Sequence, residues 1–301
     1  MEQYIQRAKA NFPFPYEIVP GRDALKRWQE IDAAKKGAPI VIGDEEAFGL
    51  ILDSFSSTSG SSSHQKEPTV ADTLAKAGRL VHPASMTEFR QKEKEKLDQY
   101  LASHPAARKQ LDSVPVVRGQ ADIEKLLKSS PGSGKKSYVI ELIGPGADPS
   151  EPANPSTTAP TPFEPPDVQK SLSTLTPPTV AWDLLKGTYF DNVYIVTLPT
   201  NDWTTAPAYL RWGGWNACPP PEYHVAAFRS WRDRYGAELV GMSSDTLNIK
   251  VVSRPAHREE AQSLAREQYE YCPDIVDQGT GSVEVLAEGL LSSDWWGFWW
   301  D

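Results

Sequence analysis

Residues 213–224, with the sequence GGWNACPPPEYH, gather several side chains that can do chemistry. Cys218 and His224 are the residue types of a thiolate–imidazole pair, in which the imidazole activates the sulfur as a nucleophile. The glycines allow positive φ angles, and the three prolines stiffen the chain. A rigid corner of this kind also suits a binding surface, which would present Trp215 and Asn216 already ordered. A purely structural corner and a functional site both stay open at this point.

Helical spacing indicates which way His224 faces. Residues 221–236 predict a helix that starts at a proline and ends at Gly236. His224, Phe228 and Trp231 fall on one face of that helix, because residues three or four apart are neighbours on a helix surface. We therefore expect His224 to pack inward with a hydrogen bond, which favours a structural role over a catalytic dyad with Cys218.

A second unusual stretch, YCPDIVDQGTGS, spans residues 271–282 and repeats the Cys-Pro pair. Asp274, Asp277 and Gln278 follow Cys272 in a predicted loop with two glycines. Carboxylates at this spacing can hold a hard cation, but the stretch lacks the length and the final glutamate of a calcium loop. Turn formation and capping of the next helix explain the same residues, so we expect no metal. The two cysteines would also give zinc only an irregular ligand set.

The elements after residue 180 predict an α+β domain. Strands are expected at 192–199, 206–212 and 295–300, a hairpin at 237–253, and helices at 221–236, 256–272 and 282–291. This order favours a mostly antiparallel sheet with helices packed on one side. The terminal WWGFWW is apolar on both of its faces, so we expect that strand to be central in the sheet or covered.

The preceding part of the chain predicts a smaller α/β N-terminal region, with a strand-helix-strand-helix order over residues 12–52. A serine-rich insertion occupies residues 54–68. Residues 144–179 hold 10 of the 26 prolines and few apolar residues, a composition typical of an extended linker. We therefore predict three parts: the N-terminal region over 1–143, the linker over 144–179, and a C-terminal domain over 180–301.

The net charge of −9 is concentrated near the C-terminus, since residues 181–301 contain 9 Lys and Arg against 17 Asp and Glu. Such a domain repels phosphate backbones, which argues against nucleic acid, and it attracts a basic protein partner. The plainer alternative is that the acidity only confers solubility. No apolar run is long enough for a membrane span, and the N-terminus lacks the apolar core of a signal peptide. We therefore expect no membrane contact and a cytoplasmic location.

Three blocks in order carry a family resemblance: GGWNACP at 213–219, YCPDIVDQG at 271–279 and FWWD at 298–301. Over about residues 180–301 the chain resembles the bacterial domain-of-unknown-function 4253 family. The resemblance implies a cytosolic bacterial protein with a compact α+β domain, and the family name brings no activity with it. The blocks imply one shared surface, formed by Trp215, Asn216, Cys218, Glu222, Cys272, Asp274, Asp277 and Gln278. His224 completes the set of candidate residues.

The sequence contains no complete catalytic, nucleotide-binding or metal-binding motif, so we expect no cofactor. We predict a non-enzymatic protein-interaction module that captures a basic partner. Neutralisation of a basic toxin, as an immunity protein performs it, is one concrete version of this role. The alternative is a hydrolase, with cysteine or metal-assisted chemistry, built from Cys218, His224, Asp274 and Asp277. That alternative requires the two Cys-Pro segments to meet beside an open cleft.

Overall fold

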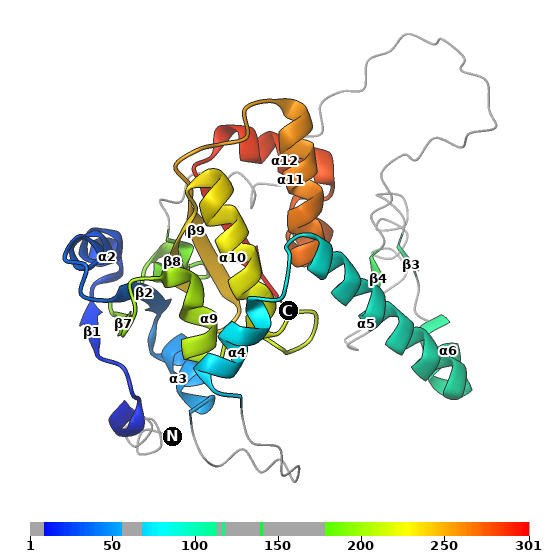
Figure 1. Cartoon of the computed structure of the whole chain (residues 1–301), viewed down its shortest axis with the longest axis horizontal. Helices are drawn as coiled ribbons and strands as arrows, with labels where there is room; N and C mark the ends of the chain where they lie inside the picture. The colour runs from blue at the N-terminus through cyan, green and yellow to red at the C-terminus, as the bar shows by residue number, and fades with distance from the viewer. Residues whose placement is uncertain (1–8, 56–67, 113–115, 118–138, 141–177, 301) are drawn as a thin grey trace. The chain divides into compact units, whose positions relative to one another are not determined.

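The computed structural model of the chain describes residues 9–55, 68–112, 116–117, 139–140 and 178–300 (Figure 1). The chain forms two compact units. The first unit contains Met1–Asp98 and Pro177–Asp301, and the second contains Gln99–Thr176. All of the candidate residues belong to the first unit, because they lie between residues 215 and 278.

A six-stranded sheet forms the centre of the first unit. In spatial order its strands are β1 (Tyr16–Val19), β7 (Val193–Leu198), β2 (Ala38–Gly43), β8 (Glu238–Met242), β9 (Thr246–Lys250) and β10 (Trp295–Trp299). Every neighbouring pair is antiparallel except β2 and β8, which run parallel. The predicted α+β class with a mostly antiparallel sheet is therefore confirmed.

Strands from the two ends of the chain alternate in this sheet. β7 lies between β1 and β2, with Ile18 opposite Tyr194 and Val41 opposite Ile195. All six residues of β2 are buried, so this strand needs a cover on each face and a neighbour at each edge. Within the described residues, β1 and β2 thus belong to the same sheet as the C-terminal strands, with β1 at its edge and β2 between β7 and β8. Almost all of the predicted linker, residues 144–179, lies outside the described residues, and the division of the chain there stays a prediction.

Alternation along the strands separates two hydrophobic clusters, one on each face of the sheet. In β7, Tyr194 and Val196 belong to the larger cluster, whereas Val193 and Ile195 belong to the smaller one. The helices that contribute to the larger cluster include α3 (Glu45–Asp53), α10 (Pro221–Tyr235), α11 (Arg258–Tyr271) and α12 (Val283–Ser292). The C-terminal helices thus pack on one face, as predicted.

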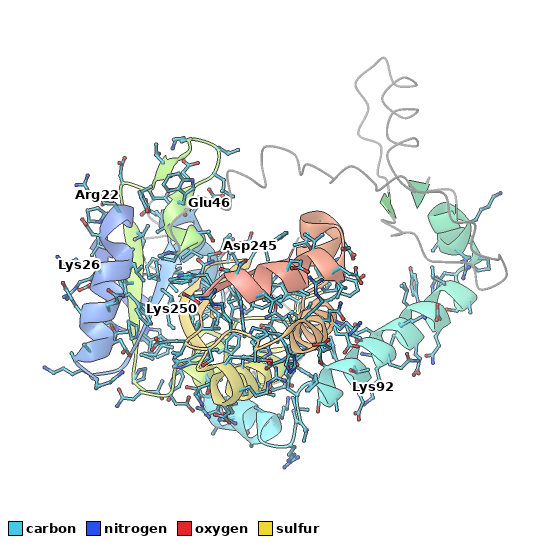
Figure 2. The ribbon with its side chains drawn as sticks, turned by 90° about the horizontal axis from the view of Figure 1, so that it is seen from above. Arg22, Lys26, Glu46, Lys92, Asp245 and Lys250 are labelled. Carbon is cyan, nitrogen blue, oxygen red and sulfur yellow. The ribbon has the colours of Figure 1, made fainter. Side chains whose placement is uncertain are left out.

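One helix of the N-terminal region, α2 (Ala24–Ala33), covers the opposite face. Trp28 packs into the smaller cluster, and its indole N–H donates a hydrogen bond of 2.8 Å to the carbonyl of Pro39 in β2. Lys26 lies on the outer, exposed side of the same helix (Figure 2). This amphipathic helix lets β2 be buried on both sides, which a sheet covered on one face would not allow.

Capping residues and helix-breaking residues set the boundaries of the C-terminal helices, and those of α10 were predicted. α10 begins at Pro221 and ends before Gly236, which has a φ of 58°. The side chain of His257 caps α11 by accepting a hydrogen bond from the N–H of Glu260. The hydroxyl of Ser282 caps α12 in the same way, through the N–H of Val285 at 3.2 Å. These caps satisfy backbone N–H groups that have no partner inside the helix.

The strand predicted at residues 206–212 is wrong, because this segment forms the short helix α9 (Ala206–Leu210). The segment is apolar and four of its five helical residues are buried. A short apolar run shows no period that separates a buried strand from a buried helix. Pro207 stands in the first turn, where its fixed φ angle favours a helix.

The terminal strand, predicted to be central or covered, is β10 at the edge of the sheet, so it is covered but not central. Its described neighbour is β9 alone. Trp296, Phe298 and the following Trp300 point into the larger cluster and are buried. On the other face Trp295 and Trp299 are half-buried, and Gly297 between them is exposed. The strand is therefore fully covered on one face and partly covered on the other.

The remaining elements of the first unit are η1 (Gly21–Asp23), α4 (Val70–Ala77), η2 (Thr179–Ala181), the hairpin of β5 (Trp182–Asp183) and β6 (Thr188–Tyr189), η3 (Trp203–Thr205) and the π-helix η4 (Ile275–Thr280). α5 (Ala84–Ser103) begins in this unit and ends in the second, which also holds α6 (Pro105–Asp112) and the strand pair of β3 (Val116–Val117) and β4 (Val139–Ile140). Most of the serine-rich stretch 54–68 is outside the described residues. None of the described helices combines the length and the apolar character needed to cross a membrane.

Candidate functional site

The GGWNACP segment forms a tight corner between α9 and α10. Gly213 and Gly214 have φ angles of 111° and 89°, which side-chain-bearing residues rarely adopt. The N–H of Gly214 donates a hydrogen bond of 2.9 Å to the carbonyl of Pro219 and closes the corner. A Cβ atom on Gly213 would lie 2.4 Å from that carbonyl oxygen and 2.8 Å from the ring of His224. Gly213 therefore lets the backbone pass directly beside the histidine.

Cys218 and His224 do meet, but inside the core. The cysteine Sγ lies 3.4 Å from Nε2 of His224, whose side chain is fully buried. The other ring nitrogen, Nδ1, is hydrogen-bonded to the hydroxyl of Tyr271 at 2.5 Å. In a nucleophilic triad this second nitrogen would face a carboxylate that stabilises the charged imidazole. Here a neutral phenol from the second Cys-Pro segment occupies that position.

Burial keeps both members of this pair uncharged. It raises the pKa of the Cys218 thiol well above its ordinary value and lowers the pKa of His224 to about 3. Burial also raises the pKa of Cys272 to about 12. A cysteine attacks as the thiolate. With these pKa values the two cysteines are thiols and His224 is a neutral imidazole at physiological pH. The arrangement suits a hydrogen-bonded core and gives no activated nucleophile.

Arg90 on α5 joins the two Cys-Pro segments, a role that the sequence did not indicate. Its guanidinium donates to the carbonyls of Glu270 and Tyr271 at 2.7 Å each, and to that of Ala217 at 2.8 Å. The first two carbonyls belong to the last turn of α11, where carbonyls lack helical partners. Arg90 therefore caps α11 and ties its end to the corner. Its helix has alternating charges typical of a solvated surface, and no local pattern distinguishes this arginine from its neighbours.

The other candidate residues of the first segment lie nearer the surface. Trp215 is half-buried against Trp212, with the ring centroids 4.9 Å apart. Asn216 is exposed and has a φ of 44°, a left-handed conformation that asparagine tolerates. Glu222 is half-buried, and its carboxylate lies 3.8 Å from the ammonium of Lys76 on α4.

The candidate residues of the second segment divide in the same manner. Cys272 is fully buried and its thiol donates a hydrogen bond of 2.9 Å to the carbonyl of Trp299. Asp274 is half-buried just before η4, whereas Asp277 and Gln278 are exposed within that π-helix, where a loop was predicted. The hydroxyl of Tyr269 donates to Asp277 at 3.0 Å. The segments therefore meet through buried groups, namely Tyr271 and His224, and through Arg90.

The described residues contain no group of three or more His, Cys, Asp or Glu side chains that could hold a metal ion. Cys218, His224 and Cys272 accordingly do not converge as a ligand set in this part of the chain. The side chains around the pair are aromatic: Trp212 and Trp300 lie with ring centroids 4.8 and 5.6 Å from that of His224. This surrounding explains the strong burial of the histidine.

The low pKa of His224 makes the fold sensitive to acid. Below the ordinary histidine pKa of about 6.5, His224 binds a proton in the unfolded chain, but in the folded chain it stays neutral down to about pH 3. This difference leaves the free energy of unfolding unchanged well above pH 6.5 and lowers it as the pH falls, by about 2 kcal/mol between pH 7 and pH 5. Urea unfolding at the two pH values measures this loss. His224→Gln is expected to be less stable at pH 7 and to show a smaller loss, and an unchanged loss would contradict the assignment.

An acidic pocket of about 410 Å³ lies at the other end of the sheet. Ile18 of β1, the first residues of α3, the hairpin β5–β6 and the start of β7 line it. The lining includes four carboxylates and one ammonium group, those of Asp44, Glu45, Asp183, Asp191 and Lys186.

The carboxylates of the pocket already attract cations of the chain itself. The ammonium of Lys186 lies 2.9 Å from Asp183, and that of Lys9 lies 2.6 Å from Glu45. The hydrogen bond that the Lys186 ammonium donates to Asp183 raises the pKa of Lys186, and the charges of Asp191 and Asp44 act in the same direction. Lys186 nevertheless has a highly exposed side chain, so its ammonium is held at the mouth of the pocket by an exchangeable surface interaction.

Exposed apolar side chains occur in two of the elements that line this acidic pocket. Ile18 is 50% exposed, and Leu184 and Leu185, between Asp183 and Lys186, are 64% and 100% exposed. Large apolar side chains exposed together on a surface mark interaction sites more often than scattered ones do. The pocket combines negative charge with apolar contacts, which is the chemistry that a basic and partly apolar segment requires.

Sequence reasoning missed this pocket because its residues come from segments far apart in the chain. Asp44 and Glu45 appear in the sequence as the acidic start of a helix, which they are: Asp44 caps α3 by accepting from the N–H of Ala47. Asp183 and Asp191 lie about 140 residues later, in short elements with weak patterns. The excess of acidic residues over 181–301 was the one signal in the sequence, and it does not indicate where an acidic pocket lies.

The first unit is thus an α+β fold in which the Cys218–His224 pair is buried and the acidic pocket is open to solvent. Residues 194–301 match the model of a protein family described as Domain of unknown function (DUF4253). The resemblance predicted from the three C-terminal blocks is therefore confirmed over these residues. The match begins inside β7, so β1, β2 and most of the acidic pocket lie outside it. Searches of curated proteins and of solved structures found no match to the chain.

Proposed function

We propose that this protein is a non-enzymatic interaction module that binds a basic segment of a partner protein in the acidic pocket. The observation that carries the proposal is the convergence of Asp44, Glu45, Asp183 and Asp191 on one open cavity beside exposed Ile18 and Leu185. A lysine or arginine side chain fits the charge of the cavity, and acidic surfaces speed the encounter with basic partners. Cytoplasmic neutralisation of a basic toxin remains one concrete form of this role.

The hydrolase alternative has less support. Its nucleophile would be Cys218, whose buried thiol is far from ionisation, and its base would be His224, whose Nδ1 faces Tyr271. Asp277 accepts its hydrogen bond from Tyr269. A water-accessible thiolate beside an oriented base is the minimum that such chemistry needs.

A double variant of the pocket tests the proposed function. The probe is a fluorescein-labelled peptide of alternating lysine and valine, and its binding is measured by anisotropy at low and moderate salt. Asp183→Asn with Asp191→Asn removes two charges but keeps the shape of both side chains, so we expect the Kd to rise about fivefold at low salt and less at moderate salt. A peptide with glutamine in place of lysine should bind weakly to both proteins.

The matched control removes two exposed carboxylates elsewhere, through Glu259→Gln with Glu284→Gln at the starts of α11 and α12. This control has the same net charge as the pocket variant and should bind the lysine peptide nearly as the unmodified protein does. Equal weakening in the two variants would mean that only net charge matters. If the pocket variant binds the lysine peptide as tightly as the unmodified protein, the pocket is not the binding site.

A further inference from the structure

The strand β1 ends the sheet with an edge that no other described strand covers. Its side chains Tyr16 and Ile18 are 36% and 50% exposed. An edge strand offers a row of backbone N–H and C=O groups to which another strand can pair. Proteins commonly protect such edges by charge, proline or a bulge. Here Pro15 and Pro20 flank the strand and leave four residues between them open to pairing.

The register of β1 against β7 tells which backbone groups point outward. In an antiparallel pair, residues that exchange hydrogen bonds alternate with residues that do not. The N–H of Thr197 donates to the carbonyl of Pro15, so the next pair along, Tyr16 and Val196, does not exchange hydrogen bonds. Ile18 and Tyr194, two residues further, form a non-hydrogen-bonded pair as well. The N–H and C=O groups of Tyr16 and Ile18 therefore face away from β7, toward the free edge.

The free edge and the acidic pocket are neighbours, because Ile18 belongs to both. A segment paired with β1 would run past the mouth of the pocket. Alternate side chains of that segment would point to the face where Ile18 lines the pocket, since side chains on a strand repeat with a period of two. One cationic side chain of the segment could then reach the carboxylates that now attract Lys186.

We infer that the basic partner binds as an added strand, with its backbone paired to Tyr16 and Ile18 of β1 and one lysine or arginine in the acidic pocket. This inference rests on the proposed function and specifies the form of the partner. Backbone pairing supplies affinity in this recognition mode, and the pocket for an alternate side chain supplies specificity. The exposed Leu184 and Leu185 would contact apolar residues next to the cation.

A second copy of the chain fits this edge poorly. The β1 segment is YEIV, which contains a glutamate and no lysine or arginine. The Glu17 carboxylate is already paired with Arg27, but pairing of two β1 strands would bring two acidic pockets toward each other. Like charges across a strand pair are destabilising. Charge complementarity therefore favours a different, basic chain as the occupant.

The decisive variant is Ile18→Pro, compared with Ile18→Ala in the full chain. Proline removes the outward N–H of residue 18 but no hydrogen bond to β7, and edge strands tolerate proline in this position. Alanine removes the side chain and keeps the N–H. With the lysine–valine peptide as the probe, we expect the Kd to rise about tenfold for Ile18→Pro and at most threefold for Ile18→Ala. Spermine, a cation without a peptide backbone, should bind both variants and the unmodified protein equally.

Hydrogen exchange provides a second measurement that needs no variant. The peptide should slow exchange of the amides of Tyr16 and Ile18, and circular dichroism should show that Ile18→Pro remains folded.

Peptide binding that depends on Asp183 and Asp191 but not on the proline would overturn strand addition and leave the proposed function standing. Binding indifferent to both would overturn both. Concentration-dependent dimers abolished by Ile18→Pro would assign the edge to a second copy and also overturn the inference.

Discussion

Deletion of residues 295–301 is expected to abolish cooperative unfolding of the first unit. The deletion removes β10, which pairs with β9 along its whole length, and takes Trp296, Phe298 and Trp300 out of the larger cluster. Loss of one buried aromatic side chain costs about 3–5 kcal/mol, and a domain has only about 5–15 kcal/mol to lose. Thermal melts followed by circular dichroism and tryptophan fluorescence measure the effect.

Point variants separate the side chains of β10 from its backbone. Phe298 is fully buried and stacks on Trp231 of α10, with ring centroids 5.4 Å apart. Phe298→Ala keeps the strand and should lower the free energy of unfolding by about 3–4 kcal/mol. Trp299→Ala, on the half-buried face, is the matched control and should lower it by clearly less. A truncated chain that melts with the original midpoint would show that the core does not depend on β10.

The local elements of this fold were largely predictable because their signals lie within a few residues. Pro221 and Gly236 bracket α10 as predicted, and the alternation around β7 fixed that strand to within a residue at each end. The inward position of His224 followed from its spacing to Phe228 and Trp231, and it is fully buried. In each case a period or a terminal residue carries the information.

Pairing between distant segments was not predictable from those signals. Nothing within β1 or β2 names β7 as the partner, which lies more than 150 residues later. The apolar run of β10 indicates burial but cannot say that one edge of the strand stays unpaired. α9 shows the complementary failure, because five apolar residues fit a buried helix and a buried strand equally well.

The candidate site shows the same division. The sequence singled out Cys218, His224 and Cys272 by residue type, and the structure buries all three. Whether a cysteine and a histidine form a nucleophile depends on water access and on the group behind the imidazole, and both are properties of the packed chain. The acidic pocket arises only when α3 and the hairpin β5–β6 come together, so its carboxylates had no common signal in the sequence.

Substitution of Glu267 is expected to cause the second large loss of stability, because its carboxylate is the centre of a largely buried ion network. Its carboxylate on α11 accepts hydrogen bonds from Arg234 at 2.8 and 2.9 Å and from the indole of Trp231 at 2.5 Å, and Nε2 of His82 lies 2.8 Å away. Burial alone would raise the pKa of this carboxyl, but the hydrogen bonds from His82 and Arg234 outweigh it and lower the pKa. Glu267 thus joins α10, α11 and the segment between α4 and α5.

Replacement Glu267→Ala is expected to lower the free energy of unfolding by about 3 kcal/mol, because it leaves the buried Trp231 and His82 without this acceptor and removes the ion pair of Arg234. Arg234 is 39% exposed and regains water, which places the loss near the lower end of the range for buried pairs. Glu267→Gln keeps an oxygen for the Trp231 indole and should cost roughly half as much. Urea unfolding at pH 7 measures these differences.

Glu259→Ala, at an exposed position of the same helix, is the control and should change stability by less than about 0.5 kcal/mol. The sign of the pH dependence gives an independent check. Because the pKa of folded Glu267 is lowered, its contribution is present above the ordinary glutamate pKa of about 4.3 and disappears as the pH falls below it. The alanine variant should therefore lose less stability than the unmodified protein between pH 5 and pH 3. A parallel loss in both proteins would mean that the network is held by packing around Trp231 and not by the carboxylate charge.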